Sequence, residues 1–129
     1  MITYDDFAKV EIRAGKILSA EKIPDTNKLL KLQVDFNEKN AEGVSVPRQI
    51  ISGIAMYFPD PAVLVGKTCM FVTNLEPRMI KGYESNGMLF ALSTPGVPIV
   101  AEDGTTTPTV GNFSLLEPND SIPPGTKAC

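Results

Sequence analysis

Histidine and tryptophan are both absent from the 129 residues of this chain, and only two cysteines are present. Without histidine the chain lacks the most common general acid or base, the base of Ser-His and Cys-His nucleophile pairs, and the most common zinc ligand. Neither a GxxxxGK[ST] nor a GxGxxG phosphate-binding loop occurs. These absences argue against an enzyme, and we expect no metal site and no bound cofactor.

The two cysteines do not form a disulfide framework. Cys69 lies in a short apolar run and is expected in the core, whereas Cys129 is the last residue. Such a pair fits a reducing compartment. No apolar run reaches the roughly 20 residues that span a bilayer, and an N-terminal segment with Asp5 and Asp6 is unlike a secretion signal. We therefore expect a cytoplasmic protein with no membrane partner.

The net charge of −3 comes entirely from the end of the chain. Residues 1–100 contain 11 basic and 11 acidic side chains, while residues 101–129 contain Lys127 and four acids. A neutral body can still present a basic face, and the local potential governs phosphate binding more than the net charge does. The charge therefore does not exclude a nucleic-acid partner.

Alternation of apolar and polar residues predicts short β-strands, most clearly where Leu30, Leu32, Val34 and Phe36 alternate with polar side chains. The expected strands cover residues 9–18, with a bulge or bend at Gly15, and residues 30–36, 48–54, 68–73 and 88–92. A helical turn is expected at residues 3–6, where Thr3 can cap, and residues 74–87 are expected to form a long polar loop.

Five short strands, with one connection over residues 57–66 between the third and the fourth, follow the strand plan of an OB-fold barrel. Periodicity alone is equally compatible with another small barrel. The predicted fold class is all-β: a five-stranded OB-fold barrel with a short N-terminal helical turn and a C-terminal extension.

The predicted division is a barrel over residues 1–93 and an extension over residues 94–129. The extension carries scattered apolar residues such as Val97, Ile99 and Val110, which a complete barrel does not need. Left exposed, they would form an apolar patch. We expect the extension to pack on the barrel or on a second subunit, which predicts a homodimer.

Four segments carry a resemblance to a known family: residues 10–17 (VEIRAGKI), 25–29 (DTNKL), 48–54 (RQIISGI) and 74–88 (NLEPRMIKGYESNGM). In this order they resemble the tRNA-binding domain family of OB-fold type. That domain occurs at the C-terminus of many methionyl-tRNA synthetases, in the phenylalanyl-tRNA synthetase β chain and in stand-alone dimeric proteins. The resemblance implies an OB-fold and tRNA as the partner.

The resemblance also implies which residues border the RNA. They are Ser52, Asn74, Arg78, Lys81, Ser85 and Met88, with Lys28 and Arg48 as flanking cations. The residue types in the 74–88 segment agree, because guanidinium, ammonium, amide and hydroxyl groups suit phosphate, ribose and unpaired base edges. Three of these residues also have a purely structural alternative. Arg78 and Lys81 could be solvated charges, and Met88 could occupy a core position.

Asn74 could likewise cap the loop instead of touching RNA, and Ser52 could satisfy a backbone group at a bulge. The segment departs from the family pattern at Glu76 and Met79, where many members have a base, and Tyr83 is its only aromatic residue. The binding surface is therefore expected to be less basic than is usual in the family.

The predicted function is non-catalytic recognition of tRNA by shape and backbone, and a methionyl-tRNA synthetase is a candidate partner on which the domain would act in trans. The alternative is a secretion-chaperone-like protein of the same fold, because one branch of the family fits that description. It would bind polypeptides through apolar side chains such as Met56, Tyr57, Phe58 and Met79.

Overall fold

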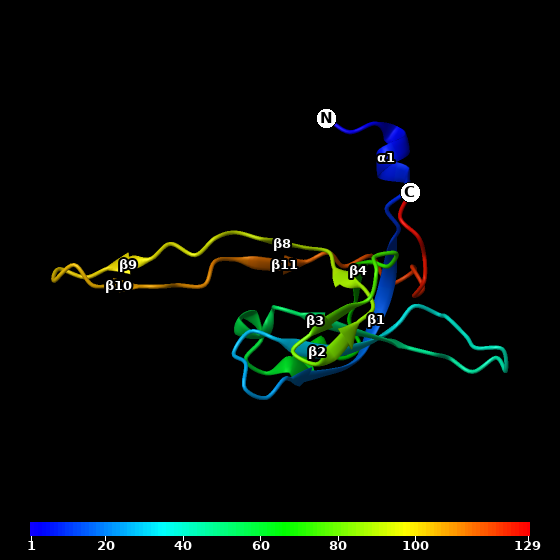
Figure 1. The fold of residues 1–129 in the computed structure, drawn as a ribbon, viewed down its shortest axis with the longest axis horizontal. Helices are drawn as coiled ribbons and strands as arrows, with labels where there is room; N and C mark the ends of the chain where they lie inside the picture. Colours follow the sequence, from blue (N-terminus) through cyan, green and yellow to red (C-terminus); the bar gives the residue numbers. More distant parts are fainter.

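A computed structural model describes residues 1–129. The helix α1 (Tyr4–Ala8) begins after Thr3, whose hydroxyl accepts a hydrogen bond from the Asp6 N–H at 3.1 Å. The Asp6 carboxylate in turn accepts one from the Thr3 N–H at 3.2 Å, so the predicted cap forms. α1 stands away from the barrel beside the C-terminus (Figure 1), and none of its residues is buried. No helix has the length and apolar character that crossing a membrane demands.

Five antiparallel strands form the main sheet in the order β3-β2-β1-β4-β7. They are β1 (Ile12–Lys22), β2 (Leu30–Asp35), β3 (Arg48–Ser52), β4 (Thr68–Val72) and β7 (Met88–Leu89). The first part of β1 pairs with β4 and the rest with β2. The irregularity of β1 lies between Ile17 and Ser19 and not at the expected Gly15. Gly15 instead permits close packing, because a Cβ there would lie 2.5 Å from Cε1 of Phe36.

The gap between β3 and β7 is closed by the segment that precedes β7. The Ile51 N–H donates to Ser85 Oγ at 2.9 Å, and the Asn86 N–H donates to the Gln49 carbonyl oxygen at 2.8 Å. We call these two contacts the seam. The sheet is thus nearly closed into a barrel, which confirms the predicted fold class.

The core fills the barrel with the side chains that the alternation places inward. Leu30, Leu32, Val34 and Phe36 are all buried, and the Phe36 ring meets Phe71 of β4 edge-on, with ring centroids 5.4 Å apart. The β3–β4 connection contains two short 3-10 turns, η1 (Ala55–Tyr57) and η2 (Pro61–Leu64). Cys69 is buried as predicted, and this burial raises the pKa of its thiol to about 12, so it is not a reactive group.

The prediction of a long loop over residues 74–87 is wrong in part, because the segment contains a hairpin. Its strands are β5 (Arg78–Ile80) and β6 (Tyr83–Ser85), joined by Lys81 and Gly82. Both turn residues have positive φ, 52° and 83°, which is what a type I′ turn requires. Such turns favour the pair Asn-Gly, and this chain has lysine in place of the asparagine. The sequence therefore contains only the glycine of the expected pair.

The remaining strands belong to the C-terminal part. β8 (Ala91–Ser93) pairs with β11 (Phe113–Leu115), and between them β9 (Ile99–Val100) and β10 (Thr106–Thr107) form an arm that projects from the barrel (Figure 1). After β11 the chain returns to β1: the Ala14 N–H donates to the Thr126 carbonyl at 2.9 Å, and the Gly125 N–H to the Ala14 carbonyl at 2.7 Å. Residues 94–129 therefore comprise an arm and a segment packed on the barrel.

Candidate nucleic-acid interface

A groove of about 240 Å³ lies between the end of β3 and the β5–β6 hairpin. We call it the Arg78 groove. Its lining includes four of the predicted RNA-contact residues, Ser52, Arg78, Ser85 and Met88. These come from β3, β5, β6 and β7, so the fold gathers in one place residues that the sequence keeps apart.

Arg78 and Lys81 supply free positive charge on this hairpin. Both side chains are exposed, and neither takes part in any of the four ion pairs of the structure. Lys81 occupies the tip of the hairpin, in a left-handed conformation that is uncommon for residues other than glycine. Glu76 lines the Arg78 groove as well, and its carboxylate lowers the positive potential there.

Apolar side chains also face this groove. Met88 is 47% exposed and Leu75 is 50% exposed, so Met88 lies at the surface and not in the core. Exposed apolar groups beside free cations form a mixed surface, on which ribose and base faces can pack while phosphates meet the charges. Nothing in the sequence distinguishes Leu75 as a surface residue, because it is one of several apolar residues in the 74–88 segment, with Met79 and Ile80.

The two serines of the Arg78 groove differ in availability. Ser85 is buried, and its hydroxyl both accepts from the Ile51 N–H and donates to the Gly87 carbonyl oxygen at 3.1 Å. Its oxygen is therefore engaged in closing the barrel. The hydroxyl of Ser52 has no hydrogen-bond partner within the protein and remains available to a ligand.

Asn74 lies beside the N-terminal segment and outside the Arg78 groove. Its Oδ1 accepts a hydrogen bond from the Glu11 N–H at 2.8 Å, and its Nδ2 donates to the Lys9 carbonyl oxygen at 2.6 Å. Both ends of the amide are thus used to hold the chain between α1 and β1. This geometry favours the capping role that the sequence left open.

Arg48 is also engaged with the protein. Its Nε and Nη2 donate to the two carboxylate oxygens of Glu38 at 2.7 and 2.8 Å, and its Nη1 donates to the Thr73 carbonyl oxygen at 2.6 Å. The hydrogen bonds between the Arg48 and Glu38 side chains lower the pKa of Glu38 and raise that of Arg48. The bidentate pair ties the 37–47 loop to β3 and leaves little of the Arg48 charge for a ligand.

Lys28 lies on the other side of Gly53. It lines a neighbouring depression of about 430 Å³ at the base of the arm, and Gly53 lines both this depression and the Arg78 groove. The Lys28 side chain is exposed and forms no ion pair. A polyanion in the Arg78 groove that extends past Gly53 would meet this third free cation.

The family model described as "Putative tRNA binding domain" matches residues 12–127. The chain belongs to this tRNA-binding domain family. It is 44% identical over 126 residues to the methionine–tRNA ligase of Methanospirillum hungatei, a match that covers 98% of this chain and 15% of the ligase. The chain thus spans about 15% of the length of such relatives and corresponds to one of their domains.

Two solved structures of similar length have the same fold as this tRNA-binding domain. The MetRS related protein from Pyrococcus horikoshii has a TM-score of 0.70 and 35% identity, and the match covers 100% of this chain and 98% of that one. Chaperone CsaA from Bacillus anthracis has a TM-score of 0.66 and 26% identity, with 100% and 99% covered. The family expected from the four sequence segments is therefore confirmed.

The predicted site residues of this tRNA-binding domain thus fall into two sets. Arg78, Lys81, Met88 and Ser52 are available around one groove, with Lys28 nearby, whereas Arg48, Asn74 and Ser85 have hydrogen-bonding partners within the protein. No three His, Cys, Asp or Glu side chains lie close enough together to hold a metal ion.

Proposed function

We propose that this domain binds tRNA without catalysing a reaction, through the Arg78 groove and the tip of the β5–β6 hairpin. The proposal rests on Arg78 and Lys81, two cations that form no ion pair within the protein. Both lie on a hairpin that hydrogen bonds hold against the barrel. Exposed Leu75 and Met88 lie beside them. Phosphate contacts position the RNA, and the rigid barrel selects its shape.

A titration with total tRNA over a series of salt concentrations tests the proposal. Lys28, Arg78 and Lys81 are the free cations at this surface, and each phosphate neutralised contributes about 0.7–0.9 to the slope of log K against log salt. We expect a slope of magnitude about 2–3 for each subunit. Absence of tRNA binding at low salt would refute the proposed function.

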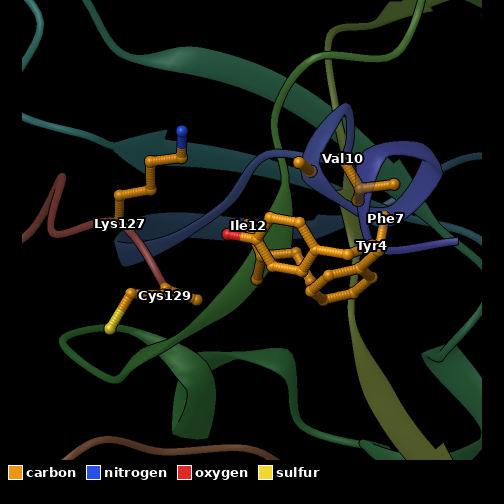
Figure 2. Close-up of a pocket in the computed structure, with 8 residues that line it drawn as sticks. Tyr4, Phe7, Val10, Ile12, Lys127 and Cys129 are labelled. Carbon is orange, nitrogen blue, oxygen red and sulfur yellow. The ribbon is translucent and has the colours of Figure 1, made fainter.

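We also propose a homodimer that uses α1 and the arm. Tyr4, Phe7 and Val10 line an apolar pocket of about 350 Å³ with Ile12 and Ala128 (Figure 2), and Val100 on the arm is exposed. Apolar surface of this kind is costly to leave in water. Light scattering at micromolar concentration should give twice the mass of the 13.9 kDa chain. A monomeric mass would refute this part.

A further proposal concerns a synthetase as the partner of this domain. The curated relatives carry this domain within a methionine–tRNA ligase. We propose that the domain can act in trans with such a ligase in the cytoplasm and raise the local concentration of tRNA. Aminoacylation by a methionine–tRNA ligase lacking the domain should then speed up when the protein is added, and no change would refute it.

Polypeptide binding is the second candidate, favoured by the likeness to a structure named chaperone CsaA and by the exposure of Met56 and Met79. Two of its expected contacts are less available, because Tyr57 and Phe58 pack against the ring of Phe113 at 4.7 and 5.6 Å. Titration of one sample with tRNA and with an unfolded polypeptide separates the two functions. Polypeptide binding with no salt dependence and no tRNA binding would favour the chaperone.

A further inference from the structure

A second groove adjoins the Arg78 groove at Leu75. Its volume is about 700 Å³, and it runs between the 37–47 loop and the segment that contains Leu75, Pro77 and Asn86. We call it the Asn86 groove. Leu75 lines both grooves, so an RNA strand leaving the Arg78 groove over this side chain would enter the second one directly.

The main chain of Asn86 is fixed while its side chain is free. The Asn86 N–H donates to the Gln49 carbonyl at 2.8 Å, and its carbonyl oxygen accepts from Arg48 Nη1 at 3.3 Å. The carboxamide makes no hydrogen bond within the protein, and Asn86 is one of the residues that line the groove. It therefore presents a donor and an acceptor side by side on a rigid support, the pattern that a base edge complements.

The charge and the walls of the groove suit a nucleotide. Glu38 is neutralised by Arg48, whereas Lys39 forms no ion pair, so the local balance is positive. Leu75 and Pro77 give one wall an apolar surface, against which the flat face of a base can pack. A phosphate can meet Lys39 while the base edge meets Asn86, and this contact would add about 0.7–0.9 to the salt slope expected from Lys28, Arg78 and Lys81.

An extended peptide fits this groove less well. Peptides commonly bind a sheet by adding a strand to a free edge. Here the edge of β3 is already occupied at the seam, since the Ile51 N–H and the Gln49 carbonyl both have partners. The available groups are side-chain amides and a cation, which favour an unpaired nucleotide.

We propose that the Asn86 groove holds one unpaired nucleotide of the bound RNA, with its base edge on the Asn86 carboxamide. This rests on the proposed function, because the RNA must reach the groove from the Arg78 side. It predicts that the domain distinguishes RNA with unpaired nucleotides from a blunt duplex.

The test uses the full chain, total tRNA, a mixed-sequence single-stranded RNA of 12 nucleotides and a blunt RNA duplex. Asn86→Ala should weaken binding of tRNA and single-stranded RNA by about two- to tenfold, the loss of a neutral hydrogen bond, and leave duplex binding unchanged. Arg78→Ala should weaken binding of all three. Asn27→Ala is the matched control, an exposed amide in the β1–β2 turn that lines neither groove.

The outcomes separate the two proposals. If Asn86→Ala binds every RNA like the wild type while Arg78→Ala weakens tRNA binding, the inference is wrong and the proposed function stands. Equal weakening of duplex and single-stranded RNA would overturn the base contact. A polypeptide that displaces single-stranded RNA from the wild type, and binds Asn86→Ala poorly, would assign the groove to peptides and refute the inference. Melting curves that match the wild type confirm that the variant is folded.

Discussion

Lys81→Asn should make the protein more stable and, at the same time, a weaker tRNA binder. Lys81 has φ of 52° and precedes Gly82 at 83° in a two-residue turn. A side chain with a Cβ costs roughly 1–2 kcal/mol in this conformation, and asparagine tolerates it better because its short polar group bonds locally. The variant contains the Asn-Gly pair that type I′ turns prefer.

We expect the free energy of unfolding to rise by about 0.5–1 kcal/mol, part of the cost of the left-handed conformation. For a chain of this size that corresponds to a melting temperature about 2–4 °C higher. The lost cation should weaken tRNA binding roughly ten- to hundredfold, the value of about 1.5–3 kcal/mol for a charged hydrogen bond. Thermal denaturation and a tRNA titration on the same preparation measure both quantities.

Two controls isolate the causes. Lys81→Arg keeps the charge and the strained turn, so stability and binding should both stay near those of the wild type. Lys16→Ala removes an exposed charge from β1, outside both grooves, and should change binding little. If Lys16→Ala weakens binding as much as Lys81→Asn does, the attraction is diffuse. If Lys81→Asn lowers the melting temperature, the account of the turn is wrong.

Three further changes test other parts of the structure. Glu76→Lys should tighten tRNA binding and steepen the salt slope by about 0.7–0.9, because it adds one phosphate contact in the Arg78 groove; an unchanged slope would place Glu76 off the RNA path. Ser85→Ala should lower the free energy of unfolding, measured with urea, by about 1–3 kcal/mol, because the buried Ile51 N–H loses its acceptor. The pKa of Glu38 lies below its ordinary 4.5, so its contribution to stability is complete above that pH and disappears as pH falls through the folded-state value. Glu38→Gln should therefore reduce the decrease in the urea midpoint of unfolding as the pH falls below 4.5. A decrease as steep as that of the wild type would show that other carboxylates dominate.

The strands of the barrel could be predicted because burial leaves a period of two in the sequence. Leu30, Leu32, Val34 and Phe36 are buried at alternate positions, and their pattern needs no knowledge of the partner strands. The β5–β6 hairpin could not be found in this way. Its side chains are mostly exposed, and its turn begins with a lysine where asparagine would have marked it.

The availability of the site residues could not be predicted, because it depends on partners distant in the chain. Asn74 bonds to Lys9 and Glu11, more than sixty positions away. Arg48 meets Glu38 only because β2 and β3 form a hairpin that brings the two together. Residue type and spacing predict which groups could bind RNA, while the fold determines which of them are already engaged.

The seam gives the interface a property beyond its contacts. At one point the barrel is closed by a side-chain hydroxyl, that of Ser85, in place of a main-chain group. Residues of the β3–β7 closure line both grooves, so opening the seam would dismantle both surfaces together. A ligand that needs those surfaces binds only the closed form and must stabilise it by mass action. Closure of the barrel and occupancy of the grooves are therefore one linked equilibrium, with amide exchange at Ile51 as its natural reporter.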